Sequence, residues 1–552
     1  MKNTALVSNN LPHKQRGAIG LFAVMTLMIA ILFVTLVLDS GRLWMQKRQL
    51  QSIADIAAIE AGRSLGCGPD IDDVIAAAQA AAVANGFNGA LASSPNIVQL
   101  GHVITSGGIR QFQPDEDANE AVRVVATRSV PASLFAGGLF NEQVLLSAEA
   151  VSIANVPIAA FSAGTSTAEL NTQDSALLNS LLTQLLGSNI NLSLVSYKGI
   201  ADTDITLAQL IEAQGNVANV EELLALNLTT PQFLGLLSDV IAASNTATTT
   251  ALQAVQALAS AASKNTVIKL ADVLNIAAPN ADGVLNVGIN ALSLINTVAL
   301  VANGQNAVTL PLAVNVGGLA NINTSVKIIE PPQIAIGPPA GGSGEACTVA
   351  RTSQVAIETK IATNLNLLLL ALKVDLNLRV AVAQGEASLQ TITDDGSSTN
   401  VVINGSPGIA SVGLTNGSGA GAGRIYVKVI LLGEIPLADI SLNLPVQSTS
   451  APMTFEVDRP VTSNLPQTQS TSTPVAGGLA NALNQNSTLS VKVLNLGILG
   501  VDQILGSIVR PLLVPVAAGV IDPLLKLLGI QLGVLTVNLE GVQLIQPQPL
   551  VI

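Results

Sequence analysis

The stretch RGAIGLFAVMTLMIAILFVTLVLDSGRLW, residues 16–44, decides how the rest of the chain is organised. No side chain from Ala18 to Leu38 is charged. These 21 residues, at about 1.5 Å per helical residue, span roughly 31 Å, the thickness of a bilayer's hydrocarbon core. A signal-peptide core has only about 7–15 residues and ends in a small-x-small cleavage site. Here the longer run is followed by DSGR (39–42), so we predict a permanent membrane helix, with residues 1–38 kept in the mature protein.

The helical pattern continues beyond this span. Apolar residues recur at spacings of three, four and seven through DSGRLWMQKRQLQSIADIAAIEAGRSL, and no proline occurs between Ala18 and Leu65. We therefore predict one helical rod from about Ala18 to Leu65, half in lipid and half in water. The sequence GCGP at 66–69 ends it.

A compact unit follows the rod. Asp70 is a suitable N-cap for a second helix over 71–84, and Asn85-Gly86 a suitable stop. Alternating apolar residues at 96–104, 121–129 and 143–154 then predict short strands. Two helices and a small sheet are the expected content of this unit.

The remainder divides by pattern. Short amphipathic segments rich in Leu, Asn and Ala predict helices up to about residue 305, and long alternating runs after residue 348 predict an antiparallel sheet. Residues 448–474 look like a linker or long loop, and residues 507–545 are apolar enough that a second membrane span stays open. The fold class is α+β. The predicted regions are a cytoplasmic tail (1–17), a transmembrane helix (18–38), an α+β domain (39–156), a helical region (157–330) and a β-rich region (331–552).

Charge separates the membrane-flanking part from the body. The chain up to Arg63 has a balance of +4, whereas the rest has a balance of −16. An acidic body repels phosphate backbones, which argues against nucleic acid as a partner. The basic flank suits anionic lipid head groups, so the bilayer is the partner that charge predicts.

The sequence offers little for catalysis. Its only histidines are His13, in the basic tail, and His102, in a strand-like run. We found no HExxH, CxxC or G-x-S-x-G motif, and GSGAGAG (417–423) lacks the Lys-Ser/Thr of a phosphate loop. We therefore predict no enzyme, no catalytic residue, no cofactor and no metal. An envelope hydrolase that uses His102 or a carboxylate pair is the weaker alternative.

Two cysteines, Cys67 and Cys347, are far apart in the sequence. In an oxidising compartment they could form one disulfide. Two separate buried or free thiols are the alternative that the sequence leaves open.

The first 65 positions contain a set of residues with a characteristic spacing. They are Arg16-Gly17, Asp39, Arg42, Leu43, Leu50-Gln51, Ala54-Asp55, Ala57-Ala58 and Ala61-Gly62. This pattern resembles the N-terminal region of TadG-like proteins of the Flp (tight adherence) pilus assembly system. The resemblance extends through AVRVVATRSVPASLFAGGLF, and so covers about residues 14–152. More distantly, IEPPQIAIGPP followed by ARTSQV is similar to the longer proteins of this type.

The resemblance implies a single-pass inner-membrane protein that helps build or anchor an adhesive pilus with other Tad/Flp proteins. Its N-terminus would be cytoplasmic and its large C-terminal part periplasmic, which settles an orientation that the basic residues on the two sides of the span leave nearly tied. Asp39, Arg42 and Asp55 are the candidate assembly or anchor residues. A membrane-tethered adhesin that is not linked to a pilus is the alternative.

The resemblance also bears on processing. Type IV-like prepilins carry Glu five residues after the processing Gly, and the fifth residue after Gly17 is Phe22, which argues against a prepilin peptidase. The small residues Ala54, Ala57, Ala58, Ala61 and Gly62 would allow close approach of a partner helix. Packing on the chain's own sheet explains them equally well.

Overall fold

The computed structural model describes most of the chain. The described residues are 18–68, 70–106, 109–116, 118, 120–133, 143–164, 172–244, 248–277, 284–304, 307–310, 322–341, 344–367, 370–416, 418, 421–429, 433–442, 444–446, 449–461, 464–471, 478–484, 489–494, 504–528, 530 and 532–544. They form two compact units. The first contains residues 18–62 and 71–153, and the second contains residues 63–70 and 154–544. The region boundaries predicted above remain predictions.

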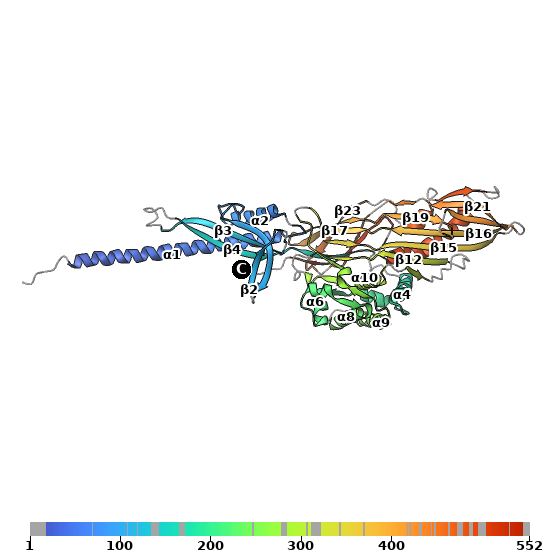
Figure 1. The fold of residues 1–552 in the computed structure, drawn as a ribbon, viewed down its shortest axis with the longest axis horizontal. Helices are drawn as coiled ribbons and strands as arrows, with labels where there is room; N and C mark the ends of the chain where they lie inside the picture. The colour runs from blue at the N-terminus through green and yellow to red at the C-terminus, as the bar shows by residue number, and fades with distance from the viewer. Residues whose placement is uncertain are drawn as a thin grey trace, which may run out of the picture. The chain divides into compact units, whose positions relative to one another are not determined.

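The first unit is built on one long helix. Helix α1 (Ala18–Arg63) runs without interruption for 46 residues, which confirms the predicted rod. Figure 1 shows it as a single straight element whose first half extends beyond the strands of its own unit. Helix α2 (Ile71–Ala84) has the predicted bounds, with Asp72 and Asp73 in its first turn, where acidic side chains suit the helix dipole.

A four-stranded antiparallel sheet completes this unit, in the order β2-β1-β3-β4. The strands are β1 (Ile97–Ser106), β2 (Ile109–Pro114), β3 (Ala121–Pro131) and β4 (Gln143–Ile153). Its longest pairing joins β3 to β4 over eleven residues, from Ala121 opposite Ile153 to Pro131 opposite Gln143. The sheet agrees with the three strands predicted from alternation and adds β2.

The second unit contains a group of short helices. They are α4 (Thr172–Leu186), α5 (Leu194–Ala201), α6 (Leu207–Gln214), α7 (Val220–Ala225), α8 (Thr230–Ala243), α9 (Thr249–Ala261) and α10 (Ala291–Asn303). Thr206 and Thr229 start α6 and α8 with capping boxes, in which Gln209 and Gln232 bond back to the cap. Two small ribbons, β6 (Asp204–Thr206) with β10 (Gly288–Asn290) and β7 (Asn227–Thr229) with β8 (Val267–Lys269), link them.

Three sheets make up most of the rest of this unit. The largest contains β11 (Ala307–Leu310), β12 (Ile322–Glu330), β15 (Gln354–Leu367), β16 (Leu370–Val382), β19 (Ala410–Thr415), β20 (Gly423–Val429), β21 (Gly433–Leu442), β22 (Leu444–Val446) and β25 (Leu489–Val493). A second contains β14 (Val349–Arg351), β17 (Glu386–Asp394), β18 (Ser398–Ser406) and β23 (Ala451–Asp458). Figure 1 shows α4, α6, α8, α9 and α10 gathered along the long strands of this unit.

The third sheet brings together strands from nearly the whole length of the second unit's sequence. Its order is β24 (Gln467–Ser470), β26 (Thr536–Gln543), β5 (Ile158–Ala163), β13 (Ile334–Gly337) and β9 (Leu274–Ile276). Strand β5 is buried along its entire length. Strands β5 and β26 come from opposite ends of this unit's sequence and pair with each other, so the sheet holds the two ends of the unit together.

Two sequence interpretations change. The expected linker at 448–474 contains β23 and β24, because alternation in APMTFEVD is a strand pattern that the surrounding Ser, Thr and Pro concealed. The apolar C-terminal segment forms η4 (Leu505–Val509), α13 (Arg510–Val516), η5 (Ala517–Ile521) and α14 (Asp522–Leu527). By length and composition Leu505–Leu527 could cross a membrane, but 56% of its apolar window is buried, with Leu513, Val516 and Leu524 fully so. It packs as a core helix of the second unit.

Candidate functional site at the end of the membrane helix

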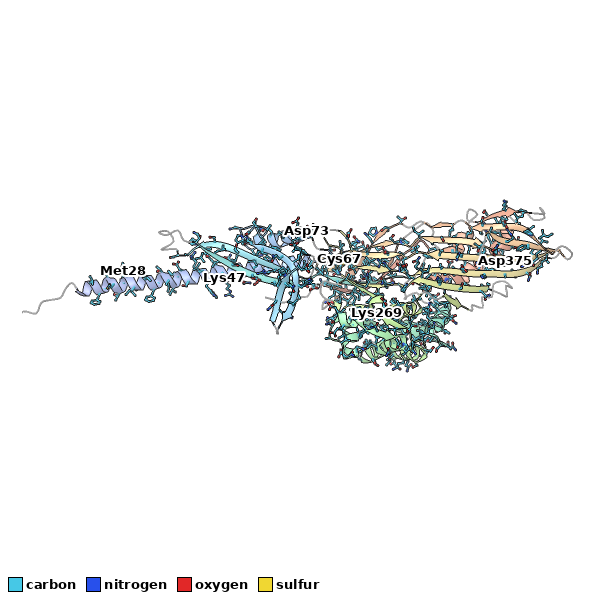
Figure 2. The ribbon with its side chains drawn as sticks, viewed as in Figure 1. Met28, Lys47, Cys67, Asp73, Lys269 and Asp375 are labelled. Carbon is cyan, nitrogen blue, oxygen red and sulfur yellow. A yellow bond between two sulfur atoms is a disulfide. The ribbon has the colours of Figure 1, made fainter. Side chains whose placement is uncertain are left out.

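The surroundings of α1 change sharply along its length. Large apolar side chains from Leu21 to Leu38 are 54–69% exposed, and none of the most apolar window of this helix is buried. Leu50 and Ile53, one turn apart further along, are 0–1% exposed. Figure 2 shows Met28 on the uncovered part of α1 and Lys47 where the strands of the first unit begin to accompany it. The change therefore falls between Leu38 and Leu50.

Three polar side chains of α1 fasten this part of the helix to the sheet. Arg42 Nη2 donates to the carbonyl oxygen of Pro131, and Lys47 Nζ donates to that of Ser147. One further turn along, Gln51 Nε2 donates to the carbonyl oxygen of Glu149 at 2.7 Å. These acceptors lie on the end of β3 and on the edge strand β4, whose outer backbone groups have no strand neighbour in the described sheet. The helix thus satisfies the edge of its own sheet.

The three predicted assembly residues occupy different surroundings. Asp39 and Arg42 are half-buried at the end of the exposed stretch, and Arg42 is directed to Pro131. Asp55 accepts a hydrogen bond from Gln51 Nε2 at 2.8 Å. It lies 16 residues beyond Asp39, about 24 Å along the helix axis. Asp39 and Arg42 can therefore belong to one site, whereas Asp55 belongs to the packing of helix on sheet.

The small-residue face of α1 is used within the chain. Ala54, Ala57, Ala58 and Ala61 are all 0% exposed. A Cβ atom on Gly62 would lie 2.9 Å from both the carbonyl oxygen of Ile153 and Oγ of Ser152, at the end of β4. The sequence left open whether these small residues pack on a partner helix or on the chain's own sheet. In the structure they pack within the chain.

Trp44 and Arg48 were not singled out from the sequence. Arg48 lies over the Trp44 ring, 5.6 Å from its centroid, and Trp44 is 64% exposed. The signal was available, because Trp is enriched at membrane–water interfaces and this one stands six residues after the apolar run. The end of the span thus combines cationic groups with an exposed indole.

His102 has surroundings that do not resemble a nucleophilic site. It lies on β1, where Nε2 is 2.9 Å from Asp115 Oδ2 and Nδ1 is 2.9 Å from Glu120 Oε2. Hydrogen bonds to Glu120 and then to Asp115 raise the pKa of the imidazole. A histidine held between two carboxylates at the surface favours its charged form, which is a poor general base.

The two cysteines are joined. Cys67 and Cys347 form a disulfide with a Cα–Cα distance of 5.4 Å, across 280 residues of sequence. Cys67 is buried (2% exposed) and pairs with Ala340 as an isolated parallel bridge, whereas Cys347 is exposed. The backbones are close enough that a Cβ on Gly341 would lie 2.2 Å from the Cys67 carbonyl oxygen. The short segment after α1 is therefore built into the second unit.

The second unit contains a buried carboxylate, that of Glu540, which is 3% exposed. Glu540, on β26, accepts hydrogen bonds from Ser162 Oγ at 2.5 Å and from the Asn290 backbone N–H at 2.9 Å. Burial raises the pKa of Glu540 to about 7, and the charge of nearby Asp204 adds to this. Asp204 keeps contact with solvent, yet desolvation and Asp202 raise the pKa of its carboxyl group as well.

These carboxylates border a cavity of about 300 Å³ that Asp202, Asp204, Asn290, Thr468, Asn538 and Glu540 help to line. Within the described ranges, no three His, Cys, Asp or Glu side chains are arranged as a metal site. Glu540 instead joins the five-stranded sheet to the β6–β10 ribbon, because its two oxygens bond one element of each. No sequence pattern pointed to it.

Family comparisons agree with the N-terminal resemblance. Residues 17–64 match a family described as putative Flp pilus-assembly TadE/G-like, and residues 60–152 match one described as putative Tad-like Flp pilus-assembly. Residues 174–300 match a domain of unknown function (DUF8293). No curated protein and no solved structure matches the chain significantly. The two N-terminal matches support involvement in Flp pilus assembly.

Proposed function

Because its residues 17–152 match two families of Flp pilus-assembly proteins, we propose that the chain is a TadG-like, non-enzymatic envelope protein that anchors or helps assemble this pilus. Its anchor is the exposed apolar half of α1, and its working part is the body that α1 carries. The observation that supports this most directly is the continuity of α1, which is apolar and exposed before Leu38 and built into a protein core from Leu50 onward.

The proposed location is the inner membrane, with the N-terminus in the cytoplasm and the body in the periplasm. The Cys67–Cys347 disulfide supports this orientation, because disulfides persist in oxidising compartments and are rare in the cytosol. The proposed partners are the bilayer and other Tad/Flp proteins, and the acidic body argues against nucleic acid.

An in-frame deletion, complemented by the wild-type gene, tests the proposal. We expect the deletion strain to lose surface pili and the complemented strain to regain them, with the protein recovered in the inner-membrane fraction. A deletion strain with normal pili but reduced adhesion would instead favour the membrane-tethered adhesin. The exposed Cys347 and the buried Cys67 give a further check of orientation, since both must resist thiol alkylators in intact cells until a reductant is added.

A further inference from the structure

Four exposed apolar side chains of the first unit lie just beyond the end of the span. Trp44 and Met45, on α1, are 64% and 67% exposed. Val144 and Leu145, near the start of β4, are 37% and 57% exposed. All four lie within a few residues of a hydrogen bond that joins α1 to the β3–β4 hairpin. We call these four residues the membrane-proximal surface.

Hydrogen bonds fix where the β3–β4 hairpin lies along α1. Arg42 bonds to Pro131, which pairs with Gln143 across the hairpin, so the start of β4 is level with about the first turn after the span. Lys47 bonds to Ser147, four residues further along β4. Val144 and Leu145 lie between these two levels. The two strand residues and the two helix residues therefore occupy the same layer.

This layer has the depth of lipid head groups. Arg42 is four residues after Leu38, about 6 Å along the helix axis. The interfacial region of a bilayer adds about 5–8 Å to each side of the hydrocarbon core. If the hydrocarbon ends at Leu38, the end of the hairpin that is level with Arg42 reaches the interfacial region.

The charges in this layer suit lipid as the occupant. Lys47 and Arg48 are exposed there, and Arg48 lies over Trp44. Indole rings prefer the head-group level, and cationic side chains next to a span attract anionic lipids. The surface is also continuous with the exposed apolar side chains of α1 up to Leu38, which the bilayer itself covers under the proposed function.

We propose that the membrane-proximal surface contacts the head-group layer of the bilayer that α1 crosses, so that the β3–β4 hairpin is a second point of attachment beside the span. This inference rests on the proposed function, because it takes the bilayer position from α1. It adds a constraint that a single helix lacks: a helix held also by a sheet at the interface cannot rotate freely about its own axis.

Fluorescence quenching by shallow nitroxide-labelled lipid tests this in the full-length protein, reconstituted in phosphatidylcholine–phosphatidylglycerol vesicles. Trp44 is the only tryptophan, so its intrinsic emission reports the end of the span. A fluorophore on Leu145→Cys reports the hairpin. The matched control is Ile104→Cys, on β1, where Ile104 is 43% exposed. It lies beyond the point where Gly101 pairs with Ala121, at the end of β3 that is far from Pro131. The native cysteines are bonded to each other and do not take the label.

We expect the labelled lipid to quench both Trp44 and the probe at 145 at least twofold more than the probe at 104. Quenching of Trp44 without quenching at 145 would overturn the second attachment and leave the span in place. A probe at 145 that is protected in cells yet unquenched in these vesicles would assign the surface to a partner protein, which also overturns it. If Trp44 itself is not quenched, the end of the span does not lie at the head-group level, and the proposed position of α1 in the bilayer is wrong. Wild-type thermal unfolding of both cysteine variants shows that they are folded.

Discussion

The guanidinium group of Arg42 donates a hydrogen bond to the backbone carbonyl of Pro131, 89 residues later in the sequence. The first cation after the span therefore serves the protein's own fold, and through Lys47 and Gln51 the same contact continues along the edge of β4. These three hydrogen bonds join α1 to the sheet within the first unit. Asp39, three positions before Arg42, is the other candidate assembly residue at this end of the span, and we propose that its charge serves assembly.

Asp39→Asn tests that proposal. Asparagine keeps the size and hydrogen-bonding capacity of the side chain but removes its charge, so insertion and protein level should stay at the wild-type value while piliation falls. Asp73→Asn is the control, because Asp73 is an exposed carboxylate on α2 of the same unit. Immunoblots of membrane fractions and counts of sheared pili are the measurements. Wild-type piliation with Asn at position 39 would reduce this residue to a boundary marker.

Gly62→Ala should destabilise the first unit. The new Cβ would meet the Ile153 carbonyl oxygen and Ser152 Oγ, each at 2.9 Å, and overpacking of this kind costs about 1–3 kcal/mol. Gly41→Ala is the matched control on the same helix, because nothing lies within 4 Å of its Cβ and alanine favours a helix by about 1 kcal/mol. Thermal unfolding in detergent compares the two. Equal stability of the two variants would contradict the close contact of α1 with β4.

Loss of the disulfide should destabilise the second unit. In the loop-closure model, a bridge across 280 residues stabilises the folded state by up to about 5 kcal/mol. Denaturant unfolding of Cys67→Ser/Cys347→Ser should therefore have a lower midpoint than wild type, and wild type in reductant should approach the double variant. Non-reducing electrophoresis after treatment of cells with an alkylator checks the bond itself. Labelling of both cysteines in the native protein would end the idea.

Stability should fall as the pH rises through about 7, because of Glu540. The pKa of this group is about 7 in the folded protein and 4.5 as the ordinary value, so the folded state binds the extra proton between these two values. Below about pH 4.5 both states hold the proton and no penalty exists. Above pH 7 both have lost it, and the folded state carries the full cost, roughly 3 kcal/mol at about 1.4 kcal/mol per unit of pKa.

Glu540→Gln should remove this dependence. The amide oxygen can accept from the Asn290 N–H, and the amide nitrogen can donate to Ser162 Oγ, so both hydrogen bonds persist without the buried charge. The variant should be more stable than wild type at pH 8 and similar to it at pH 4.5. Glu386→Gln serves as control, since Glu386 is an exposed partner of Arg351. A wild-type pH profile in Glu540→Gln would show that another group titrates.

The sequence predicts elements wherever one periodicity persists. The 46 residues of α1, the bounds of α2 and the helices between α4 and α10 follow from apolar spacing and caps, because those patterns are local. The expected linker at 448–474 was wrong because strand β23 gains its stability from pairing with β18, a partner about fifty residues earlier that local composition does not reveal.

The candidate site was predictable only in part. The resemblance drew attention to Asp39, Arg42 and Asp55. What the sequence could not supply is the partner of each: a backbone carbonyl such as that of Pro131 carries no residue signature. Glu540 was invisible for the same reason, since its burial depends on β5 and β10, which come from distant parts of the chain.

The disulfide changes the route that a mechanical load takes through this chain. A pull on the body of the protein against its membrane helix would, along the backbone alone, pass through every residue between positions 67 and 347. The bond between the two sulfur atoms provides a covalent short cut that leaves out those residues, the helices α4–α10 among them. The covalent path then bypasses those residues, and load reaches them only through noncovalent contacts such as the pairing of β5 with β26 and of β12 with β15. The disulfide therefore joins the segment after α1 to the strands beyond Cys347 without depending on the fold of the residues between the two cysteines.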